Sequence, residues 1–306
     1  MKNLWRLSPL VLILFLSCFP PAKKHSISFA TEADFRNFLN RKSNSFPLIS
    51  AHRGAPTSEF PENAIETFEQ GRLWQPLVIE FDVAMTQDSA LVLMHDDRLD
   101  RTSNGTGLVR EQSFEAIRKL NLKDQNGKLT SARIPTLEEV LIWGKDKVLF
   151  TVDVKRGVPF SKVVKAIEKA GAARYAIVIT YNANQAQEVH QLNPSLMISV
   201  SARSVADLDR LNALGVPDNR MVAFVGTSVP DESLFKAFHE RGISCIVGTM
   251  GNLDKSALAN PSNQVYKGIL EKGADFISTD ELRLSGEDFD AFRNTNKLVI
   301  KAHKFQ

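Results

Sequence analysis

Imidazole, guanidinium and carboxylate side chains gather at the ends of short apolar runs in this chain. His52 and Arg53 follow the run Leu48–Ala51, and His95 follows the run Leu91–Met94. Histidine has an unperturbed pKa of about 6.5, so one imidazole can accept a proton while another donates one near neutral pH. Arginine presents paired, planar donors that fit a phosphate group. These residue types together indicate transfer at a phosphorus centre.

Two other apolar runs carry charged residues at alternate positions. Glu80 and Asp82 lie two residues apart in Leu77–Val83, and Asp153 precedes Lys155 by two residues. Alternate residues of a strand point to the same side. Two carboxylates about 7 Å apart in a confined site repel each other unless a cation neutralises them, and a hard divalent ion with oxygen ligands does so. The pattern predicts a cation site, with a solvated polar strand end as the alternative.

Short β-rich runs alternate with amphipathic segments from about residue 47 onward. This order predicts βα units and a parallel sheet. The predicted strands are Leu48–Ala51, Leu77–Val83, Val148–Val154, Ala176–Tyr181, Met197–Ser201, Met221–Val225, Ile243–Val247 and Asp275–Thr279, with a further short run at Leu91–Met94. The predicted helices are Asn63–Leu73, Thr136–Trp143, Phe160–Ala170, Ala183–Leu192, Val205–Leu214, Asp231–Arg241 and Gln264–Lys272.

Eight strands with intervening helices predict a single (β/α)8 barrel of the α/β class over residues 47–306. A doubly wound open sheet is the competing fold, and it commonly has a Gly-rich first βα turn. The turn here reads His52-Arg53-Gly54-Ala55-Pro56, without that motif. In a barrel the chemistry lies at the carboxyl ends of the strands, where the polar residues above are placed. The stretch 84–147 is too long for one crossover helix and predicts an insertion on that face.

Residues 1–17 have the layout of a bacterial export signal. Lys2 and Arg6 precede the apolar run Leu10–Leu16, which is too short for a bilayer that takes about 20 residues. A buried core helix is the alternative, but basic and proline residues flank the run. Leu16-Ser17-Cys18 resembles a lipoprotein signal in which Cys18 is the first mature residue and takes up lipid. We therefore expect an exported protein, periplasmic or membrane-anchored through Cys18, with a polar leader over 18–46.

The overall composition is that of a globular protein. Apolar residues make up 43% and charged residues 24%, which argues against disorder. The net charge of +3 is too small for the electrostatic footprint of a nucleic-acid binder. Cys245 lies in an apolar run and is predicted to be a small buried thiol, so no disulfide framework is expected.

Taken together, the motifs resemble the glycerophosphodiester phosphodiesterase family, one of the phosphatidylinositol phospholipase C-like barrel phosphodiesterases. The resemblance runs from about residue 48 to 284 in order and spacing. The matching stretches are His52-Arg53-Gly54, Pro61-Glu62-Asn63, Glu80-Phe81-Asp82-Val83, His95-Asp96-Asp97 with Leu99–Gly107, Asp153-Val154-Lys155 and Gly273–Asp280.

The resemblance implies a (β/α)8 barrel and assigns roles to individual residues. They are His52 and His95 as the acid/base pair; Glu80, Asp82 and Asp153 as ligands of one divalent cation, Ca²⁺ or Mg²⁺; Arg53 and Lys155 as phosphate contacts; and Glu62 and Asn63 as their support. Asn63 is also expected to open the first helix, because asparagine is a good N-cap.

The activity that the resemblance implies is metal-dependent hydrolysis of small-molecule glycerophosphodiesters to glycerol 3-phosphate and an alcohol. In the family, a glycerol hydroxyl of the substrate is thought to attack the adjacent phosphorus and leave a cyclic phosphate that water opens. Two departures stand out. The family most often has Glu at the position of Asp153, and many members carry an aromatic-rich turn where this chain has Gly248–Asn252.

Three other functions fit part of the pattern. The same barrel chemistry could serve a phospholipase C- or D-like hydrolysis of intact lipids. A non-catalytic phosphodiester-binding lipoprotein is disfavoured because both histidines, the arginine and three carboxylates are present. A saccharide hydrolase using Glu80 and Asp82 is disfavoured because both side chains face one side of a strand and cannot flank a bond.

Overall fold

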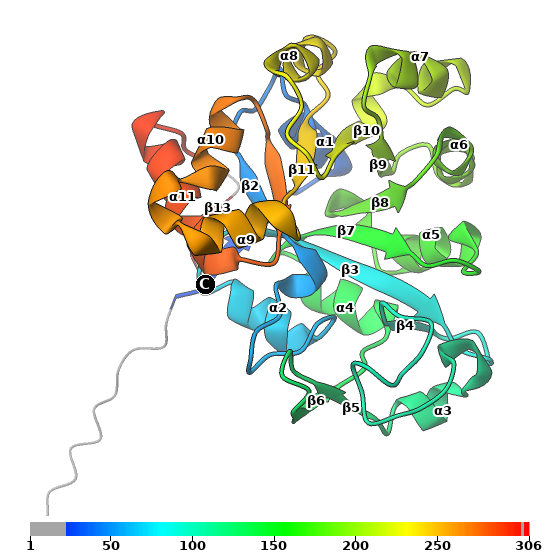
Figure 1. Ribbon diagram of the computed structural model, residues 1–306. Helices are drawn as coiled ribbons and strands as arrows, with labels where there is room; N and C mark the ends of the chain where they lie inside the picture. The colour runs from blue at the N-terminus through cyan, green and yellow to red at the C-terminus, as the bar shows by residue number, and fades with distance from the viewer. Residues whose placement is uncertain (1–22, 301–302, 306) are drawn as a thin grey trace, which may run out of the picture.

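Eight parallel strands close into a barrel in the computed structural model, which describes residues 23–300 and 303–305 (Figure 1). Each barrel strand pairs with the next one along the chain, and the last pairs with the first. The predicted single (β/α)8 barrel is therefore confirmed. The barrel strands are β2 (Leu48–Ala51), β3 (Leu77–Met85), β7 (Leu149–Val154), β8 (Ala176–Thr180), β9 (Met197–Ser201), β10 (Met221–Gly226), β11 (Cys245–Gly248) and β12 (Phe276–Thr279).

Helices surround the barrel and bury one face each against the strands (Figure 1). In α5 (Phe160–Lys169), the buried positions Val163, Val164 and Ile167 recur at helical spacing, so one stripe packs on the sheet. All the predicted helices and strands are present, with ends within two residues of those expected. The other outer helices are α2 (Ile65–Gly71), α4 (Leu137–Gly144), α6 (Ala183–Leu192), α7 (Val205–Ala213), α8 (Glu232–Glu240), α9 (Asn252–Ala259), α10 (Val265–Glu271) and α11 (Leu282–Thr295).

An insertion between β3 and α4 has a small core of its own. It contains β4 (Leu91–Leu93), α3 (Phe114–Ile117) and the antiparallel pair β5 (Asn121–Lys123) and β6 (Leu129–Arg133). β4 pairs antiparallel with the end of β3. The stretch 84–147 was expected to be the insertion, but its last part is α4, which is the crossover helix to β7. The insertion core consists of Ala64, Ala84, Val92, Met94, Leu99, Val109, Ile117, Leu122, Ala132 and Ile134.

The segment expected to be a polar leader, 18–46, contributes two elements of the fold. β1 (His25–Ile27) pairs antiparallel with β13 (His303–Phe305). α1 (Glu32–Leu39) begins at a capping box formed by Thr31 and Asp34. Phe35 and Phe38 of α1 are buried, so this segment packs on the barrel although its average composition is polar.

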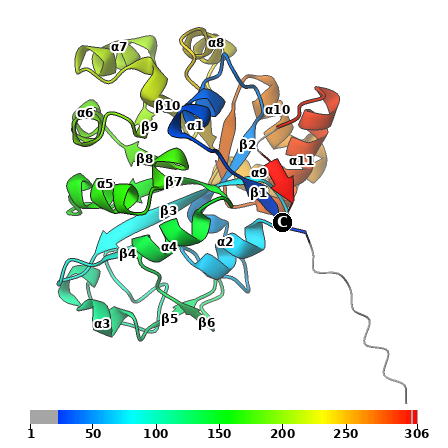
Figure 2. The same ribbon diagram turned by 180° about the vertical axis from the view of Figure 1, so that it is seen from behind.

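β1 lies at the amino-terminal end of the barrel, which we call the base. The amide of His25 donates to the carbonyl of Arg72 over 2.8 Å, and the amide of Ile27 donates to the carbonyl of Lys147 over 3.0 Å. Arg72 precedes β3 and Lys147 precedes β7, so both carbonyls lie where barrel strands begin. Figure 2 shows β1 beside β13 in the view from behind.

The amino-terminal expectations concern residues that the structure does not describe. Residues 1–17 and Cys18 lie outside the described range, so the export signal and the lipidation of Cys18 stay predictions. Within residues 23–300, no helix combines the length and apolar character needed to cross a bilayer. Cys245 is a buried free thiol, as predicted, and burial raises its pKa well above the ordinary value.

Candidate active site

Three carboxylates converge because β3 and β7 are neighbours in register. Asp82 of β3 lies opposite Asp153 of β7, and Glu80 shares the face of Asp82 two residues earlier. All three side chains are buried, and their ligand oxygens can lie within 4.8 Å of one another. The strand pattern alone placed only Glu80 and Asp82 on one side of a strand, and the family resemblance added Asp153 to them; the structure brings the three together.

Burial and mutual repulsion make this cluster costly when it carries three negative charges. Burial raises the pKa of Glu80 well above its usual range, and the charge of Asp82 adds to the rise. Burial also raises the pKa of Asp153. For Asp82, burial favours the neutral acid, but Lys155 and a hydrogen bond from Asn63 outweigh it and lower the pKa.

The cluster fits a hard divalent cation. Its donors are carboxylate oxygens, the ligands that Ca²⁺ and Mg²⁺ prefer. Oδ1 of Asp153 is buried and has no hydrogen-bond partner among the described residues, so this oxygen is available to a cation. The ammonium of Lys155 lies 3.2 Å from Asp82 Oδ1 and 3.3 Å from Asp153 Oδ2, so part of the charge is already balanced.

A tight turn after β2 places His52 and Arg53 beside these carboxylates. Arg53 adopts a left-handed conformation with φ 51°, and its amide donates to Glu80 Oε2 over 2.8 Å. Gly54 also has a positive φ, and a Cβ there would lie 2.5 Å from the ring of Phe68. Only glycine therefore fits this position of the turn.

Glu62 and Asn63 contact residues of the site, but Asn63 does not cap a helix as expected. α2 begins at Ile65 with Ala64 as its N-cap. The side chain of Asn63 instead donates to Asp82 Oδ2 over 2.9 Å and accepts from the amide of Asp82 over 3.0 Å. Asn63 thereby fixes both the main chain and the carboxylate of Asp82, and its left-handed φ of 58° explains why it does not start the helix.

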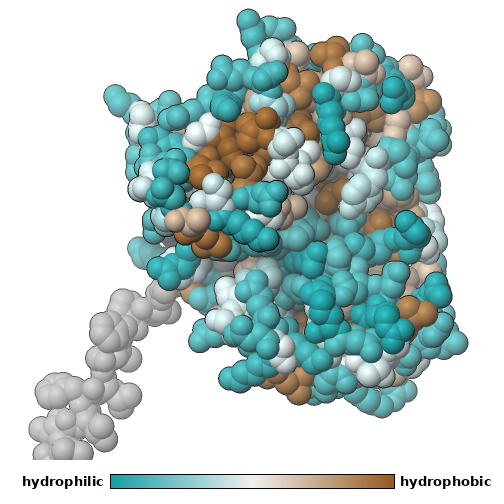
Figure 3. Space-filling model, viewed as in Figure 1, coloured by the Kyte–Doolittle hydropathy of each residue, from teal (hydrophilic) through white to brown (hydrophobic). Residues whose placement is uncertain are grey.

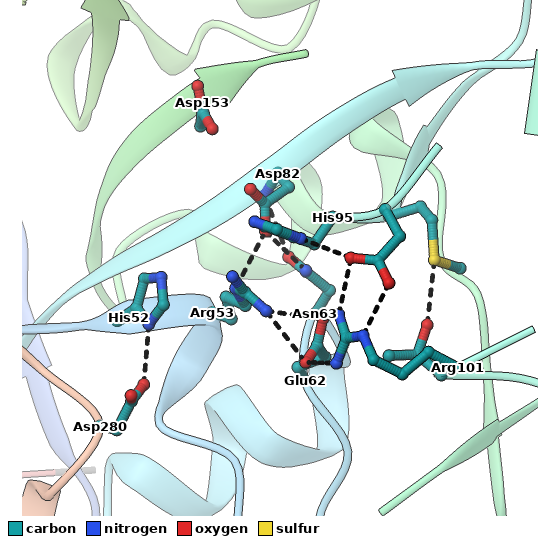
Figure 4. Close-up of polar contacts among 12 residues, drawn as sticks. His52, Arg53, Glu62, Asn63, Asp82, His95, Arg101, Asp153 and Asp280 are labelled. Carbon is teal, nitrogen blue, oxygen red and sulfur yellow. Dashed lines mark hydrogen bonds and ion pairs between the residues drawn. The ribbon is translucent and has the colours of Figure 1, made fainter. Parts of the chain in front are cut away.

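A network of ion pairs joins the turn to the insertion (Figure 4). The carboxylate of Glu62 lies 3.2 Å from Nη1 of Arg53 and 2.8 Å from Nη1 of Arg101. Arg101 also donates to Asp96, which lies 2.7 Å from Nδ1 of His95. Hydrogen bonds from Arg101, together with His95, lower the pKa of Asp96 despite its partial burial. Asp96 is therefore an anion that can hold His95.

His52 has a carboxylate partner of its own. Nδ1 of His52 lies 2.8 Å from Oδ1 of Asp280, the residue after β12. A carboxylate anion can only accept, so Nδ1 carries the proton and Nε2 is left for the substrate. Figure 4 shows His52 and His95 on either side of Arg53, with His95 next to Asp82.

Several of these residues line one cavity of about 190 Å³ at the carboxyl ends of the strands. The lining includes both histidines, the three carboxylates, Lys155 and several serine and threonine side chains. Larger side chains also line it, among them Ile179, Tyr181, Phe224, Ile246 and Met250. On the face in Figure 3, hydrophilic residues cover the lower half, where the insertion lies, and an apolar patch covers part of the upper left.

Four residues of the site received no role from the sequence. Asp96 and Asp280 stand in the quoted motifs, and each follows a strand end, which was the available signal. Arg101 also stands in a quoted stretch, Leu99–Gly107, and Tyr181 ends a predicted strand, but neither position indicated a partner. Arg101 contacts Glu62, which is 39 residues away along the chain, and Asp96, which is 5 residues away. Tyr181 approaches Asp153 from the neighbouring strand. Burial and the charge of Asp153 raise the pKa of Tyr181, so its hydroxyl stays protonated.

Comparison with known proteins decides the family. A family model described as the Glycerophosphoryl diester phosphodiesterase family matches residues 52–284. The chain belongs to this family. Among solved structures, a glycerophosphoryl diester phosphodiesterase from Parabacteroides distasonis superposes on this family member with a TM-score of 0.83 at 31% identity, covering 88% of this chain and 94% of that one.

Curated relatives in the family match a shorter region. A glycerophosphodiester phosphodiesterase from Caldanaerobacter subterraneus subsp. tengcongensis is 35% identical over 161 residues, which cover 50% of this chain and 65% of that protein. The match thus spans slightly less than two thirds of the relative. An Oleispira antarctica phosphodiesterase shares the fold, with a TM-score of 0.63 at 20% identity over 80% of this chain and 97% of that one.

Proposed function

We propose that this family member hydrolyses glycerophosphodiesters to glycerol 3-phosphate and an alcohol. The observation that carries the proposal is the convergence of His52, His95 and the Glu80, Asp82 and Asp153 cluster on a single cavity. Each of the two imidazoles has Nε2 left for the substrate, and both rings line the same cavity as the carboxylate oxygens. Acid/base transfer at a phosphate requires such an arrangement. The family's name and the 35% identical curated relative support the same activity.

In the proposed reaction, one imidazole takes the proton of a glycerol hydroxyl as that oxygen bonds to phosphorus. The bond from phosphorus to the alcohol oxygen breaks, and the other imidazole gives its proton to the departing alcohol. The oxygen of a water molecule then bonds to the phosphorus of the cyclic phosphate, and the ring bond from phosphorus to the attacking glycerol oxygen breaks. The two imidazoles exchange roles, so one takes a proton from the water and the other returns a proton to the released hydroxyl. Asp280 holds His52 and Asp96 holds His95 in the orientation that these transfers need.

Glu80, Asp82 and Asp153 would hold the divalent cation, Ca²⁺ or Mg²⁺, which when bound supplies charge stabilisation at the phosphate oxygens. Arg53 and Lys155 lie beside the carboxylates and would contact the same oxygens. Because Arg53 is tied to Glu62, its guanidinium is fixed before substrate arrives.

The amino-terminal sequence supports export and anchoring. Lys2, Arg6, the apolar run Leu10–Leu16 and Ser17-Cys18 together support a lipoprotein signal cleaved before Cys18. The mature protein would then be held at a membrane through a lipid on Cys18.

A product-release assay tests the activity. Purified protein is incubated with glycerophosphocholine, glycerophosphoethanolamine, glycerophosphoglycerol and glycerophosphoinositol, with Ca²⁺ or Mg²⁺ and with chelator. We expect turnover of at least one diester and its loss on chelation. Absence of chelator-sensitive turnover with every diester would refute the proposal.

Substitution of the histidines separates an enzyme from a binder. His52→Ala and His95→Ala are expected to lower kcat by about 10² to 10⁴-fold each at unchanged folding, because each removes a proton carrier. His190→Gln on α6, outside the cavity lining, is the matched control and should keep full activity. Hydrolysis of intact phospholipid faster than that of the diesters would favour the phospholipase alternative.

A further inference from the structure

The base of the barrel carries an excess of positive charge. It is formed by the connections that run from each helix to the next strand. The aspartates in these connections are paired with arginines: Asp146 with Arg174 at 3.2 Å, Asp218 with Arg241 at 2.8 Å, and Asp275 with Arg41 at 2.6 Å. The negative charge of these connections is therefore already neutralised.

Four lysines in the connections at the base have no such partner. Each is exposed, and none has a carboxylate within ion-pair distance among residues 23–300. They lie after α1, between α4 and β7, between α10 and β12, and after α11. These base lysines are Lys42, Lys145, Lys272 and Lys297. The base thus carries surplus positive charge of the kind that an anionic lipid surface attracts.

The amino-terminal segment also joins the protein at the base. β1 is held there by the hydrogen bonds from His25 and Ile27, and Nε of Arg72 donates to the carbonyl of His25 over 2.9 Å. Lys24 pairs with Glu69 at 2.7 Å just before β1. From Cys18 to His25 the chain advances seven residues, which reach at most about 25 Å even when fully extended.

The mouth of the barrel lies at the opposite end. β3 starts at the base and has nine residues, about 30 Å in all, of which the last continue past the mouth beside β4. A tether from the base would also have to pass around the outer helices to bring the mouth to a membrane. Seven residues are too short for that path, whereas they easily let the base meet the membrane.

We propose that the mature protein rests on an anionic membrane through the base of its barrel, with the cavity facing away from the lipid. This inference rests on the proposed lipid anchor at Cys18. The base lysines meet the lipid phosphates, and the lipid on Cys18 holds the protein there. Since one acyl chain alone binds reversibly, the lysines supply a second attachment. The cavity then takes water-soluble glycerophosphodiesters and does not reach phospholipids of the membrane that holds the protein.

Site-specific fluorescence tests the orientation in the full mature chain with its lipid. One label is placed at Ser43→Cys, an exposed position at the base, and another at Ser58→Cys, an exposed position in the connection from β2 to α2 at the mouth. Cys245 is buried and does not compete for label. The protein is bound to vesicles of phosphatidylglycerol and phosphatidylcholine that carry spin-labelled head groups. We expect the base label to be quenched and the mouth label to keep its emission. Equal quenching, or stronger quenching at the mouth, would overturn the proposal.

Two variants test the two attachments. In Cys18→Ser, weak binding to anionic vesicles that falls with salt should remain. Replacing the four base lysines by glutamine in that background should weaken it further, by about fivefold for each lysine. Unchanged binding, or a mature amino terminus that carries no lipid in the mass spectrum, would contradict the proposal. Turnover of glycerophosphoglycerol by detergent-solubilised protein is measured in parallel, so that loss of the activity itself is distinguished from a wrong orientation.

Discussion

Nδ1 of each of the two histidines lies within hydrogen-bond distance of a carboxylate, but the two carboxylates have different origins in the chain. Asp280 follows the last barrel strand and holds His52, whereas Asp96 is the direct neighbour of His95. A carboxylate in this position fixes the tautomer and the ring orientation, as it does in hydrolases that use a histidine base. Both imidazoles therefore offer Nε2 to the same cavity, and this orientation needs no movement when substrate arrives.

The first prediction concerns Asp280. In Asp280→Asn, the side-chain amide can donate to Nδ1 of His52 and would favour the tautomer with its proton on Nε2. We therefore expect kcat to fall by about 10² to 10⁴-fold with little change in KM. Glu281→Gln, the neighbouring carboxylate without a contact to His52, is the control and should retain activity. Steady-state kinetics with one diester measures both. An Asp280→Asn protein with normal kcat would show that His52 does not need this partner.

The second prediction concerns the buried charge of Glu80. Its pKa is raised in the folded protein, so the folded state holds a proton that the unfolded state, with a pKa of about 4.5, releases. Stability of the cation-free protein should therefore be full below this unfolded value and decrease as pH rises toward the folded pKa. Glu80→Gln removes the ionisation, so it should raise the free energy of unfolding near pH 8 and leave it nearly unchanged near pH 4.

Denaturant unfolding of chelator-treated protein at the two pH values measures the effect of Glu80→Gln. Glu59→Gln, on an exposed carboxylate, is the control and should shift neither value. A Glu80→Gln protein that is less stable at pH 8 than the parent would mean that Glu80 is ionised and well compensated in the folded state.

Among the elements, β3 and the insertion do most to build the site. β3 carries Glu80 and Asp82 and continues past the barrel, where β4 pairs with it and brings His95 close to Asp82. Arg101 then joins the insertion to the turn after β2, because its guanidinium contacts both Asp96 and Glu62. The two histidines thus belong to separate elements, which the side chain of Arg101 links.

The third prediction concerns the link that Arg101 makes between the insertion and Glu62. Arg101→Gln should release the insertion from Glu62 and let His95 shift, and a displacement of about 1 Å costs about 10²-fold in kcat. Arg98→Gln is the matched control, since Arg98 is 59% exposed and, among the described residues, forms an ion pair only with Asp100. Kinetics and unfolding are measured for both. Equal activity of the two variants would mean that the network does not position His95.

For the whole molecule, the ends of the described chain meet at the base, away from the cavity. β1 and β13 pair there and connect the start of the fold to its end. The fourth prediction is that deletion of residues 301–306 lowers the free energy of unfolding by about 1–3 kcal/mol, because the hydrogen bonds of this pair are lost. kcat should remain that of the full chain. Loss of turnover at a temperature where the truncated protein is still folded would contradict this division between base and mouth.

Much of the barrel could be predicted because periodicity is a local property. The runs at Leu77–Val83 and Phe160–Ala170 carry their burial pattern in neighbouring residues, and both became the expected strand and helix. α1 was missed because its buried side chains, Phe35 and Phe38, stand in a segment whose average is polar. The capping of α2 was predicted wrongly, since Asn63 finds a stronger partner in Asp82 than in the helix end.

The sequence by itself determined the barrel, the family resemblance and the identity of the residues at the strand ends, because these depend on residue type and spacing along the chain. The resemblance already grouped both histidines, the three carboxylates, Arg53 and Lys155 in one site. Only the tertiary structure decided the contacts through which they meet. The register of β3 against β7 sets Asp82 beside Asp153, and the closure of the barrel brings Asp280 to His52 from 228 positions away. Such contacts depend on packing between distant segments, and no local pattern encodes them.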